Sequence, residues 1–537
     1  MPEATAVTAG TSFRRVLRAS GAALLAVLVS LCTVACGTVP AQGERHPSFA
    51  RQPAADSPLA RIVNDSIADP ALTGFRLMPL GSYSLDARVQ LARRAHDSLD
   101  VQYYLIKADR AGGLFMRTLR DAALRGVRVR LLVDDLYTSG SDEMFSGLAA
   151  YPNVEVRLFN PFCCARGSTL GKYAASLADF GRLNHRMHNK LFIADGSAAV
   201  MGGRNIADEY FTWRDSGNFV DMDVLVIGAA IGRLRDIFDD YWNSPQAYPI
   251  DTIVPRAGTP EEARRVFERL IDEGEQMRSI TLPPNDILGY GPIAEDLDAG
   301  RLGLVWGRAM AFADPPAKAA APTAEMARSM SVQMNVMDRV LEATSEVVIS
   351  SPYFVPGTTG VSELAGLRRR GVKVSVLTNS LAATDEPVVH VGYARYRDAL
   401  LHGGVDLYEL SPKRIASSER LRLPGASLGS LHAKAAVIDE RRIFIGSTNL
   451  DPRSDSTNTE LGILADCPEL AREMIRTLNL SKLTGAYRVR LAAYGGGLEW
   501  LSLENDREVV VSEEPEVTPW LRFKTMLLAP FVPEQLL

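Results

Sequence analysis

The hydrophobic pattern of this chain predicts short strands separated by amphipathic helices. A run rich in β-branched and aromatic residues at 98–104 is followed by a helical pattern, in which Phe115, Leu119 and Ala122 share one face before Gly126 ends the helix. A second β-branched run follows this glycine. The order strand, helix, strand at this spacing indicates a βαβ unit. We therefore predict an α/β fold.

The same unit occurs twice, at a shift of roughly 245 residues. The matching segments are 98–104 with 345–351, 125–129 with 370–374, 153–156 with 404–407, and 188–205 with 432–449. Repeated units of this kind predict two mixed β-sheets, each flanked by helices and related by a pseudo-twofold axis. A shared functional site is expected at the interface of the two halves.

The repeat suggests six segments along the chain. They are a signal peptide of lipoprotein type (1–35), a tether (36–60), the first half (61–245), an insert with a linker (246–325), the second half (326–490) and a C-terminal hairpin with a tail (491–537). The linker ends in a stretch rich in proline and alanine at 314–322, which predicts a flexible connector. The hairpin is expected to turn at 495–497. The apolar, lightly cationic tail at 520–531 is expected to pack against the body rather than to touch lipid.

The N-terminus has the pattern of an export signal. Three arginines precede an uncharged apolar run at about 22–35, which is shorter than the about 20 residues that a membrane span needs. The run ends in small residues before Cys36, which resembles a lipobox. We predict lipidation of Cys36, with cleavage by the ordinary signal peptidase or an uncleaved anchoring helix as alternatives. Each outcome places the folded body outside the cytoplasm, in a bacterial envelope and facing the periplasm.

Composition narrows the classes of function and of site. With 537 residues, of which 46% are hydrophobic, the chain can form two domain-sized units, and its net charge of −5 gives no basis for a general attraction to nucleic acid. Cys163, Cys164 and Cys467 match no metal-ligand spacing, and we expect neither a metal nor another cofactor. Because neighbouring cysteines can form only a strained bridge, a disulfide from either of the first two to Cys467 stays an open option.

A histidine and a lysine two residues apart stand in both copies of the repeat. Side chains on a strand repeat every two residues, so His188 and Lys190 point to the same face. His432 and Lys434 do so in the second copy. An imidazole beside an ammonium suits an anionic phosphoryl group, and a chance occurrence of two such motifs is improbable.

Further positions recur around both pairs. In chain order they are Asp195, Gly203, Asn205, Asp439, Ser447 and Asn449. The two aspartates complete the catalytic motif, although we expect them to fix a turn rather than to touch phosphate. The asparagine amides can donate to a phosphoryl oxygen, and the small residues let a phosphate approach the backbone. His185, His390 and His402 lack such neighbours and are interpreted as structural.

These residues suffice for phosphoryl transfer without a metal. One neutral histidine attacks phosphorus, while the opposite protonated histidine gives a proton to the departing oxygen and then acts as the base for the acceptor. The lysines and asparagines neutralise and hold the non-bridging oxygens, which is the task of metal ions in many other phosphoryl-transfer enzymes.

The two motifs resemble the signature of the phospholipase D superfamily, in which histidine, lysine and aspartate recur at this spacing. Four segments, at 180–190, 202–211, 449–454 and 534–537, are similar to bacterial cardiolipin synthases of the C type. That resemblance implies transfer of a phosphatidyl group from phosphatidylglycerol or phosphatidylethanolamine onto phosphatidylglycerol, at a membrane, with a helper protein as a further candidate partner. Nucleic acid is not an expected partner.

The resemblance also implies roles for single residues. In the superfamily the histidine of the first half is usually the nucleophile, which makes His188 the nucleophile and His432 the acid. The family orients each histidine with an acidic residue: Glu460 for His188, and Asp221 for His432, with Asp223 as the competing candidate.

Three other functions remain open on the sequence. The same residues serve a phospholipase D that passes the phosphatidyl group to water and releases phosphatidic acid. A secreted phosphodiesterase acting on nucleic acid would need a basic stripe, which is not evident in this chain. A non-catalytic lipid-binding lipoprotein would leave both complete motifs without a purpose.

Overall fold

The structure is a computed structural model. It describes residues 39–40, 46–54, 56–176, 179–256, 258–272, 280, 282–418, 428–493, 496–504 and 507–533. The expected signal peptide, Cys36 and the final segment 534–537 lie outside these residues. In the described part of the chain, no helix combines the length and the apolar character needed to cross a bilayer.

Each half contains an eight-stranded mixed sheet. In spatial order the first sheet consists of β9 (Ala247–Pro249), β4 (Val154–Phe159), β3 (Arg128–Asp134), β2 (Ser98–Tyr103), β5 (Lys190–Ala194), β6 (Ala198–Gly202), β8 (Asp223–Gly228) and β1 (Thr73–Met78). The second consists of β10 (Val305–Ala313), β17 (Leu461–Asp466), β16 (Arg442–Gly446), β15 (Ala435–Ile438), β11 (Glu346–Ser350), β12 (Lys373–Asn379), β13 (Asp406–Leu410) and β18 (Ala486–Leu491). In both, three neighbouring strands are parallel and the other pairings are antiparallel.

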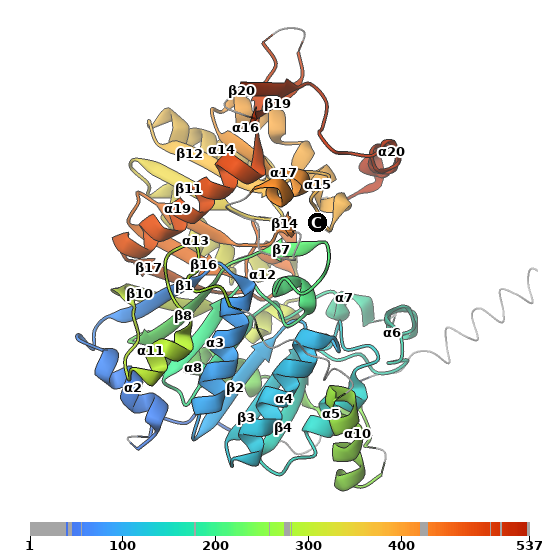
Figure 1. The fold of residues 1–537 in the computed structure, drawn as a ribbon. Helices are drawn as coiled ribbons and strands as arrows, with labels where there is room; N and C mark the ends of the chain where they lie inside the picture. The colour runs from blue at the N-terminus through green and yellow to red at the C-terminus, as the bar shows by residue number, and fades with distance from the viewer. Residues whose placement is uncertain are drawn as a thin grey trace, which may run out of the picture.

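The two sheets join at one seam. Strands β1 and β10 pair antiparallel, with Thr73 opposite Gly307. Together with the hairpin strands β19 (Leu498–Glu504) and β20 (Arg507–Val511), the two sheets form one 18-stranded sheet. Read outward from this seam, the strand order of one half repeats that of the other. The predicted pair of mixed sheets about a pseudo-twofold axis is therefore confirmed, and Figure 1 shows the halves stacked, the first below the second.

Helices cover both faces of the sheets. On the outer faces lie α3 (Gly81–Arg94), α4 (Arg110–Leu124), α5 (Asp142–Leu148) and α10 (Pro260–Asp272) in the first half, and α13 (Val332–Leu341), α14 (Gly357–Arg369) and α16 (Arg397–His402) in the second. Two others, α8 (Ile231–Trp242) and α19 (Pro468–Gly485), fill a central core with side chains from both sheets. Strand alternation explains the layers, because Leu131 faces an outer core and Leu132 the central one.

Shorter helices connect these layers. They are α2 (Pro58–Ser66), α6 (Thr169–Ala175), α7 (Phe180–Leu183), α9 (Ile250–Ile253), α11 (Ile293–Asp298), α12 (Ala324–Arg328), α15 (Pro387–Ala394), α17 (Pro412–Ser417), α18 (Pro452–Ser456) and α20 (Pro519–Leu528). The hairpin expected in the C-terminal segment is formed by β18 and β19, with Leu491 opposite Leu498.

The stretch expected to be a flexible connector is folded instead. Its first residue, Asp314, directly follows β10, and a 3₁₀ helix, η3 (Pro316–Ala320), begins two residues later. Asp314 and Lys318 are buried and form an ion pair of 2.8 Å. The proline and alanine content favoured flexibility, but pairing of β10 with β17 and burial of this ion pair fix the backbone. The second sheet thus begins at β10 rather than at residue 326.

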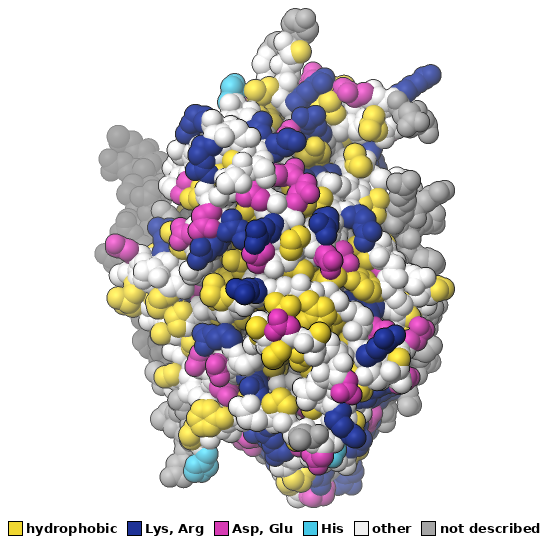
Figure 2. Space-filling model, turned by 90° about the vertical axis from the view of Figure 1, so that its left-hand side faces the viewer, with side chains coloured by type: hydrophobic (Ala, Val, Ile, Leu, Met, Phe, Trp, Pro, Cys, Tyr) yellow, Lys and Arg dark blue, Asp and Glu magenta, His cyan; other side chains and the backbone are white. Residues whose placement is uncertain are grey.

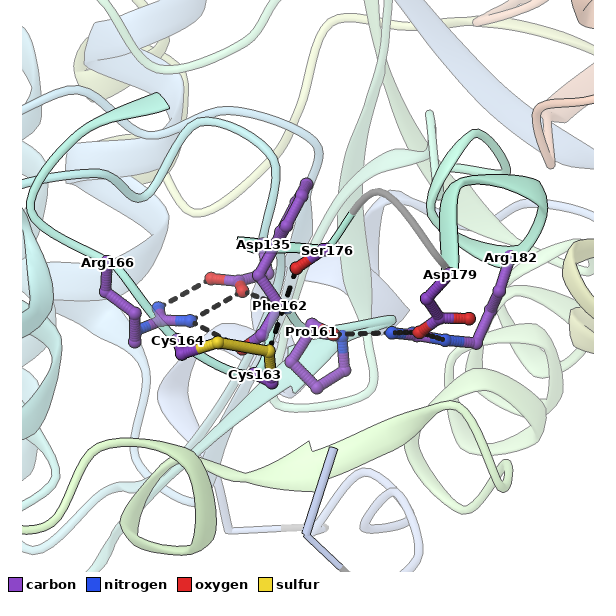
Figure 3. The surroundings of a disulfide bond; sticks show 9 residues. All are labelled: Asp135, Pro161, Phe162, Cys163, Cys164, Arg166, Ser176, Asp179 and Arg182. Atoms are coloured by element: carbon purple, nitrogen blue, oxygen red, sulfur yellow. Dashed lines mark hydrogen bonds and ion pairs between the residues drawn. A yellow bond between two sulfur atoms is a disulfide. The ribbon is translucent and has the colours of Figure 1, made fainter. Parts of the chain in front are cut away.

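The two neighbouring cysteines form a disulfide with each other (Figure 3). Cys467 is buried and free, so neither Cys163 nor Cys164 is bridged to it. The cysteines lie in the loop after β4, where Arg166 forms an ion pair of 2.6 Å with Asp135. This contact ties the loop to the carboxyl end of β3, and the loop runs on to the first histidine motif.

Candidate functional site

Short parallel pairings between the halves position the candidate catalytic groups. Strand β14 (Leu428–Leu431) runs parallel to β7 (Asn218–Val220), with Leu431 opposite Val220. His432 and Asp221 follow these strands directly, and the His432 N–H donates to the Val220 carbonyl at 2.7 Å. The backbone pairing therefore sets a histidine of the second half beside a carboxylate of the first.

The same arrangement occurs with the halves exchanged. Met187 forms a parallel bridge with Thr459, and the His188 N–H donates to the Thr459 carbonyl at 2.8 Å. His188 and Glu460 are the next residues, so they too face each other. Each histidine is thus held by a carboxylate from the opposite half, and neither half contains a complete site.

The side-chain hydrogen bonds follow from this backbone pairing. Glu460 lies 3.0 Å from Nδ1 of His188, and Asp221 lies 2.6 Å from Nδ1 of His432. All four side chains are buried. Because each carboxylate takes Nδ1, Nε2 of each ring is the nitrogen left for chemistry, and Nε2 of His432 lies 3.3 Å from Nζ of Lys434.

Asp223, the competing partner for His432, has a different role. Its carboxylate accepts a hydrogen bond from Ser84 Oγ at 2.5 Å and pairs with Arg88 at 3.0 Å, at the outer side of the first sheet. Asp221 and Asp223 are two residues apart, but Asp221 stands before β8 and faces the second half. The structure therefore assigns the contact with His432 to Asp221.

Both lysines are buried beside their histidines. Lys190 Nζ donates to the His188 carbonyl at 2.5 Å, and Lys434 Nζ donates to the His432 carbonyl at 2.6 Å. Burial lowers the pKa of Lys190 well below its ordinary value, and that of Lys434 is lowered for the same reason. An anionic phosphoryl group between them would favour both charged forms, so the pair is suited to bind one.

The two carboxylates differ in proton affinity. Burial raises the pKa of Glu460 to about 7, and the charge of Lys190 and the hydrogen bond from Ser447 offset this only in part. Burial acts in the same direction on Asp221, but the charge of His432 and the hydrogen bond with it outweigh burial and lower the pKa of Asp221. Asp221 is therefore ionised at neutral pH, and Glu460 holds a proton more readily than Asp221 does.

The two histidines differ accordingly. Burial, followed by the charges of Lys190 and Lys434, lowers the pKa of His188 well below its ordinary value. Burial and the charge of Lys434 also lower the pKa of His432, but the ionised Asp221 beside it acts in the opposite direction. His432 is therefore the histidine whose protonated form has a full negative charge beside it.

The small residues after each returning strand lie against the carboxylates. A Cβ at Gly203 would collide with the carboxylate of Asp221, so only glycine leaves room for that group. At the matching position Ser447 donates to Glu460 through its hydroxyl. Both positions therefore lie against a carboxylate, and their expected contact with phosphate stays a prediction.

The two asparagines lie buried behind the histidines. Asn205 Nδ2 donates to the hydroxyl of Tyr210 at 2.8 Å, and the side-chain oxygens of Asn205 and Asn449 have no partner among the described residues. Because Asn205 has a second amide hydrogen, this arrangement still allows donation to a ligand.

Asp195 and Asp439 lie at the opposite ends of their strands from the histidines. Asp195 accepts the backbone N–H groups of residues 96–98 at 2.8 to 3.1 Å, and Asp439 accepts those of residues 344–346 at 2.7 to 3.1 Å. Both have a positive φ, of 50° and 54°, in the turn after the strand. Through these hydrogen bonds they hold the start of the central strands β2 and β11, away from the histidines.

Several residues at the site were not expected from the sequence. The ring of Tyr104 lies 4.9 Å from that of His188, and the rings of Tyr210 and Phe219 lie 5.1 and 5.0 Å from that of His432. Asp314 accepts the N–H of Glu460 at 2.9 Å and so holds its backbone. None of these positions stands at a regular spacing from the histidine motifs; only Tyr104, at the end of the first predicted strand, carried a usable signal.

Known proteins are similar to this chain. The family model described as "Cardiolipin synthase, PLD-like domain" matches residues 89–242 and 336–480, which include both histidine motifs. Cardiolipin synthase C of Escherichia coli K12 is 38% identical over 84% of this chain and 94% of its own length. An uncharacterized protein of Helicobacter pylori J99 is 30% identical over 83% of this chain and 86% of its own.

A solved structure has the same fold. The phosphatidylserine synthase of Haemophilus influenzae Rd KW20 superposes with a TM-score of 0.54 at 13% identity, covering 89% of this chain and 99% of that one. Together with the family model and the relatives, it shows that the chain belongs to the cardiolipin synthase-like enzymes of the phospholipase D superfamily.

Proposed function

We propose that this protein is a phosphatidyltransferase that makes cardiolipin from phosphatidylglycerol and a second phospholipid, either phosphatidylethanolamine or phosphatidylglycerol. The crossed histidine–carboxylate pairs carry this proposal, because they give one buried centre two imidazoles with different proton affinities. The similarity to cardiolipin synthase C along nearly its whole length supports the choice of substrates.

The reaction has two steps at one phosphorus. Nε2 of His188 attacks the donor phosphorus, the bond to the headgroup oxygen breaks, and that oxygen takes the proton of His432. His432 then removes the proton of a phosphatidylglycerol hydroxyl, whose oxygen attacks phosphorus while the bond to His188 breaks. The lysines, with Asn205 and Asn449, stabilise the charge on the non-bridging oxygens.

Charge supports this division of roles. The nucleophile must be neutral, and burial beside two lysines disfavours protonation of His188 most strongly. The acid must hold a proton, and Asp221, 2.6 Å from His432, favours the protonated form of that imidazole.

In the same proposal the folded body is held at a bacterial membrane by a lipid on Cys36 and faces the periplasm.

The direct test is the lipid product. We expect purified protein to convert phosphatidylglycerol into cardiolipin. If phosphatidylethanolamine is the preferred donor, adding it should increase the rate of cardiolipin formation. Mass spectrometry of the extracted lipids separates the outcomes. Phosphatidic acid without cardiolipin would contradict the transferase and indicate a hydrolase; unchanged lipids, with and without the second phospholipid, would contradict both.

The pH dependence of Asp221→Asn tests the assignment of the acid. Removing the negative charge beside His432 lowers the pKa of that imidazole further, because Asp221 now raises it. The first step needs protonated His432. In the pH profile of kcat/KM, we therefore expect the alkaline limb, where activity falls with rising pH, to move to lower pH. Each unit of displacement reduces activity above the limb about tenfold.

Glu460→Gln is the matched control for this measurement. It changes the carboxylate beside His188 and should leave the alkaline limb in place, although it lowers the overall rate. If Asp221→Asn left the limb unmoved, or if Glu460→Gln moved it equally, His432 would not be the acid.

A further inference from the structure

The C-terminal helix α20 presents large apolar side chains to solvent. Trp520, Phe523, Met526 and Leu527 are 71, 49, 66 and 58% exposed, and the rings of Trp520 and Phe523 stack at 6.0 Å. The opposite side of the helix is attached to the body through buried Thr525. The sequence-based expectation that this tail packs against the body is therefore wrong for most of its apolar side chains.

Helix α20 is fixed in place close to the candidate site. It packs on α15, and Arg395 donates to the carbonyls of Ala529 and Val532 at 2.8 and 3.1 Å. The loop that leads into α15 holds Asp385, which accepts the hydroxyl of Tyr353 at 2.9 Å and acts electrostatically on His432. One helix thus connects the exposed apolar surface to the rim of the site.

The first half contributes apolar side chains to the same side of the molecule. Leu170 in α6 is 82% exposed and Phe180 in α7 is 47% exposed, and α7 lies shortly before His188 in the chain. In Figure 1, α20, α15, α7 and α6 all lie along the right-hand side. On the left-hand side, drawn in Figure 2, Lys and Arg side chains are interspersed with Asp and Glu, with hydrophobic clusters between them.

We propose that α20 is a membrane-docking helix, which lies in the plane of a phospholipid bilayer with Trp520, Phe523 and Leu527 among the acyl chains. The helix has 10 residues, so it can lie in the interface but cannot cross it. Tryptophan favours the level of the headgroups, and exposed Lys524 can reach lipid phosphates from the same helix. Anionic phosphatidylglycerol complements Lys524, whereas Arg522 forms an ion pair of 2.6 Å with Glu513.

This inference rests on the proposed function, which supplies the phospholipid substrates, and it adds an orientation of the protein on the bilayer. A tether at the N-terminus would hold the protein near the bilayer but would leave its orientation free. Docking through α20, with Leu170 and Phe180 on the other half, would turn the site toward the surface that holds both substrates. A phospholipid headgroup would then reach His188 without leaving the bilayer completely.

Contact quenching by brominated acyl chains tests the docking directly. The full chain is reconstituted in vesicles of phosphatidylcholine and phosphatidylglycerol, with or without bromine on the acyl chains. Trp520 is one of 5 tryptophans and the most exposed of those in the structure, so bromine should remove about a fifth of the emission. Trp520→Phe should abolish this loss, whereas Trp213→Phe should keep it.

Quenching that is absent in the wild type, or unchanged in Trp520→Phe, would overturn the proposal. It needs no turnover, so it can succeed or fail independently of cardiolipin synthesis. If Phe523→Cys instead gave disulfide-linked dimers and no quenching appeared, α20 would be an interface between two copies of the chain.

Activity on two forms of substrate gives a second measurement. We expect Phe523→Glu combined with Leu527→Glu to reduce the rate on vesicles at least tenfold and to leave the rate on detergent-dispersed lipid unchanged. Leu124→Glu is the matched control, because Leu124 is an exposed leucine at the end of α4, where the strands begin and the site does not lie. Equal losses on both forms of substrate would contradict docking.

Discussion

His188→Ala is expected to abolish both steps of the reaction, including the first step with an activated donor. We consider a phosphatidyl ester of p-nitrophenol, whose leaving group departs without protonation. The wild type should release nitrophenol continuously. The alanine variant has no imidazole to attack phosphorus, so neither a burst nor turnover should follow, and the rate should fall by on the order of 10⁴- to 10⁶-fold.

The measurement is stopped-flow absorbance of nitrophenolate with enzyme in stoichiometric amounts, followed by lipid analysis for cardiolipin. His185→Ala is the control, because His185 is a partly buried histidine of the same segment that bonds the Thr457 carbonyl at 2.9 Å and lies outside the proposed chemistry. A burst that survives in His188→Ala would show that another group is the nucleophile.

His432→Ala is expected to separate the two steps. With the p-nitrophenyl donor the acid is not required, so His188 should still attack and release one equivalent of nitrophenol per enzyme. The second step needs a base to remove the proton of the acceptor hydroxyl, and that base is missing. The phosphatidyl group should therefore remain on the protein, with turnover reduced by about 10²- to 10⁴-fold.

Radiolabelled donor tests this trapped state. Label should stay with His432→Ala in a form that acid releases and base does not, which is the stability of a phosphohistidine. With natural phosphatidylglycerol as donor the same variant should be unlabelled, because glycerol is a poor leaving group without an acid. If the burst appeared in His188→Ala and not in His432→Ala, the two roles would be exchanged.

Much of the site could be predicted from the sequence because each histidine motif stands at the start of a strand, β5 or β15. A period of two residues places His188 and Lys190 on one face, and the internal repeat supplies the second pair without further assumptions. The βαβ order also sufficed to predict the two sheets. These inferences depend on spacing along the chain, which a sequence displays directly.

Contacts between distant segments could not be predicted in this way. Gly203 looked like a place for a phosphate, and the sequence does not show that it lies against the carboxylate of Asp221, from the segment between β7 and β8. The stretch around Asp314 looked flexible, because its composition hides the partner strand β17 and the burial of Lys318. The attachment of α20 depends on Arg395, more than 100 residues earlier in the chain.

Because each half supplies the carboxylate for the histidine of the other, the two copies of the repeat are constrained to evolve together. After a gene duplication, one copy is normally free to drift while the other keeps the original task. Here we expect a change at Asp221 to impair the histidine of the other copy, and a change at Glu460 to do the same in reverse, because each carboxylate holds the histidine of the opposite half. Neither copy can lose its carboxylate without impairing the other copy, so we expect the repeat to stay recognisable in any descendant that keeps the chemistry.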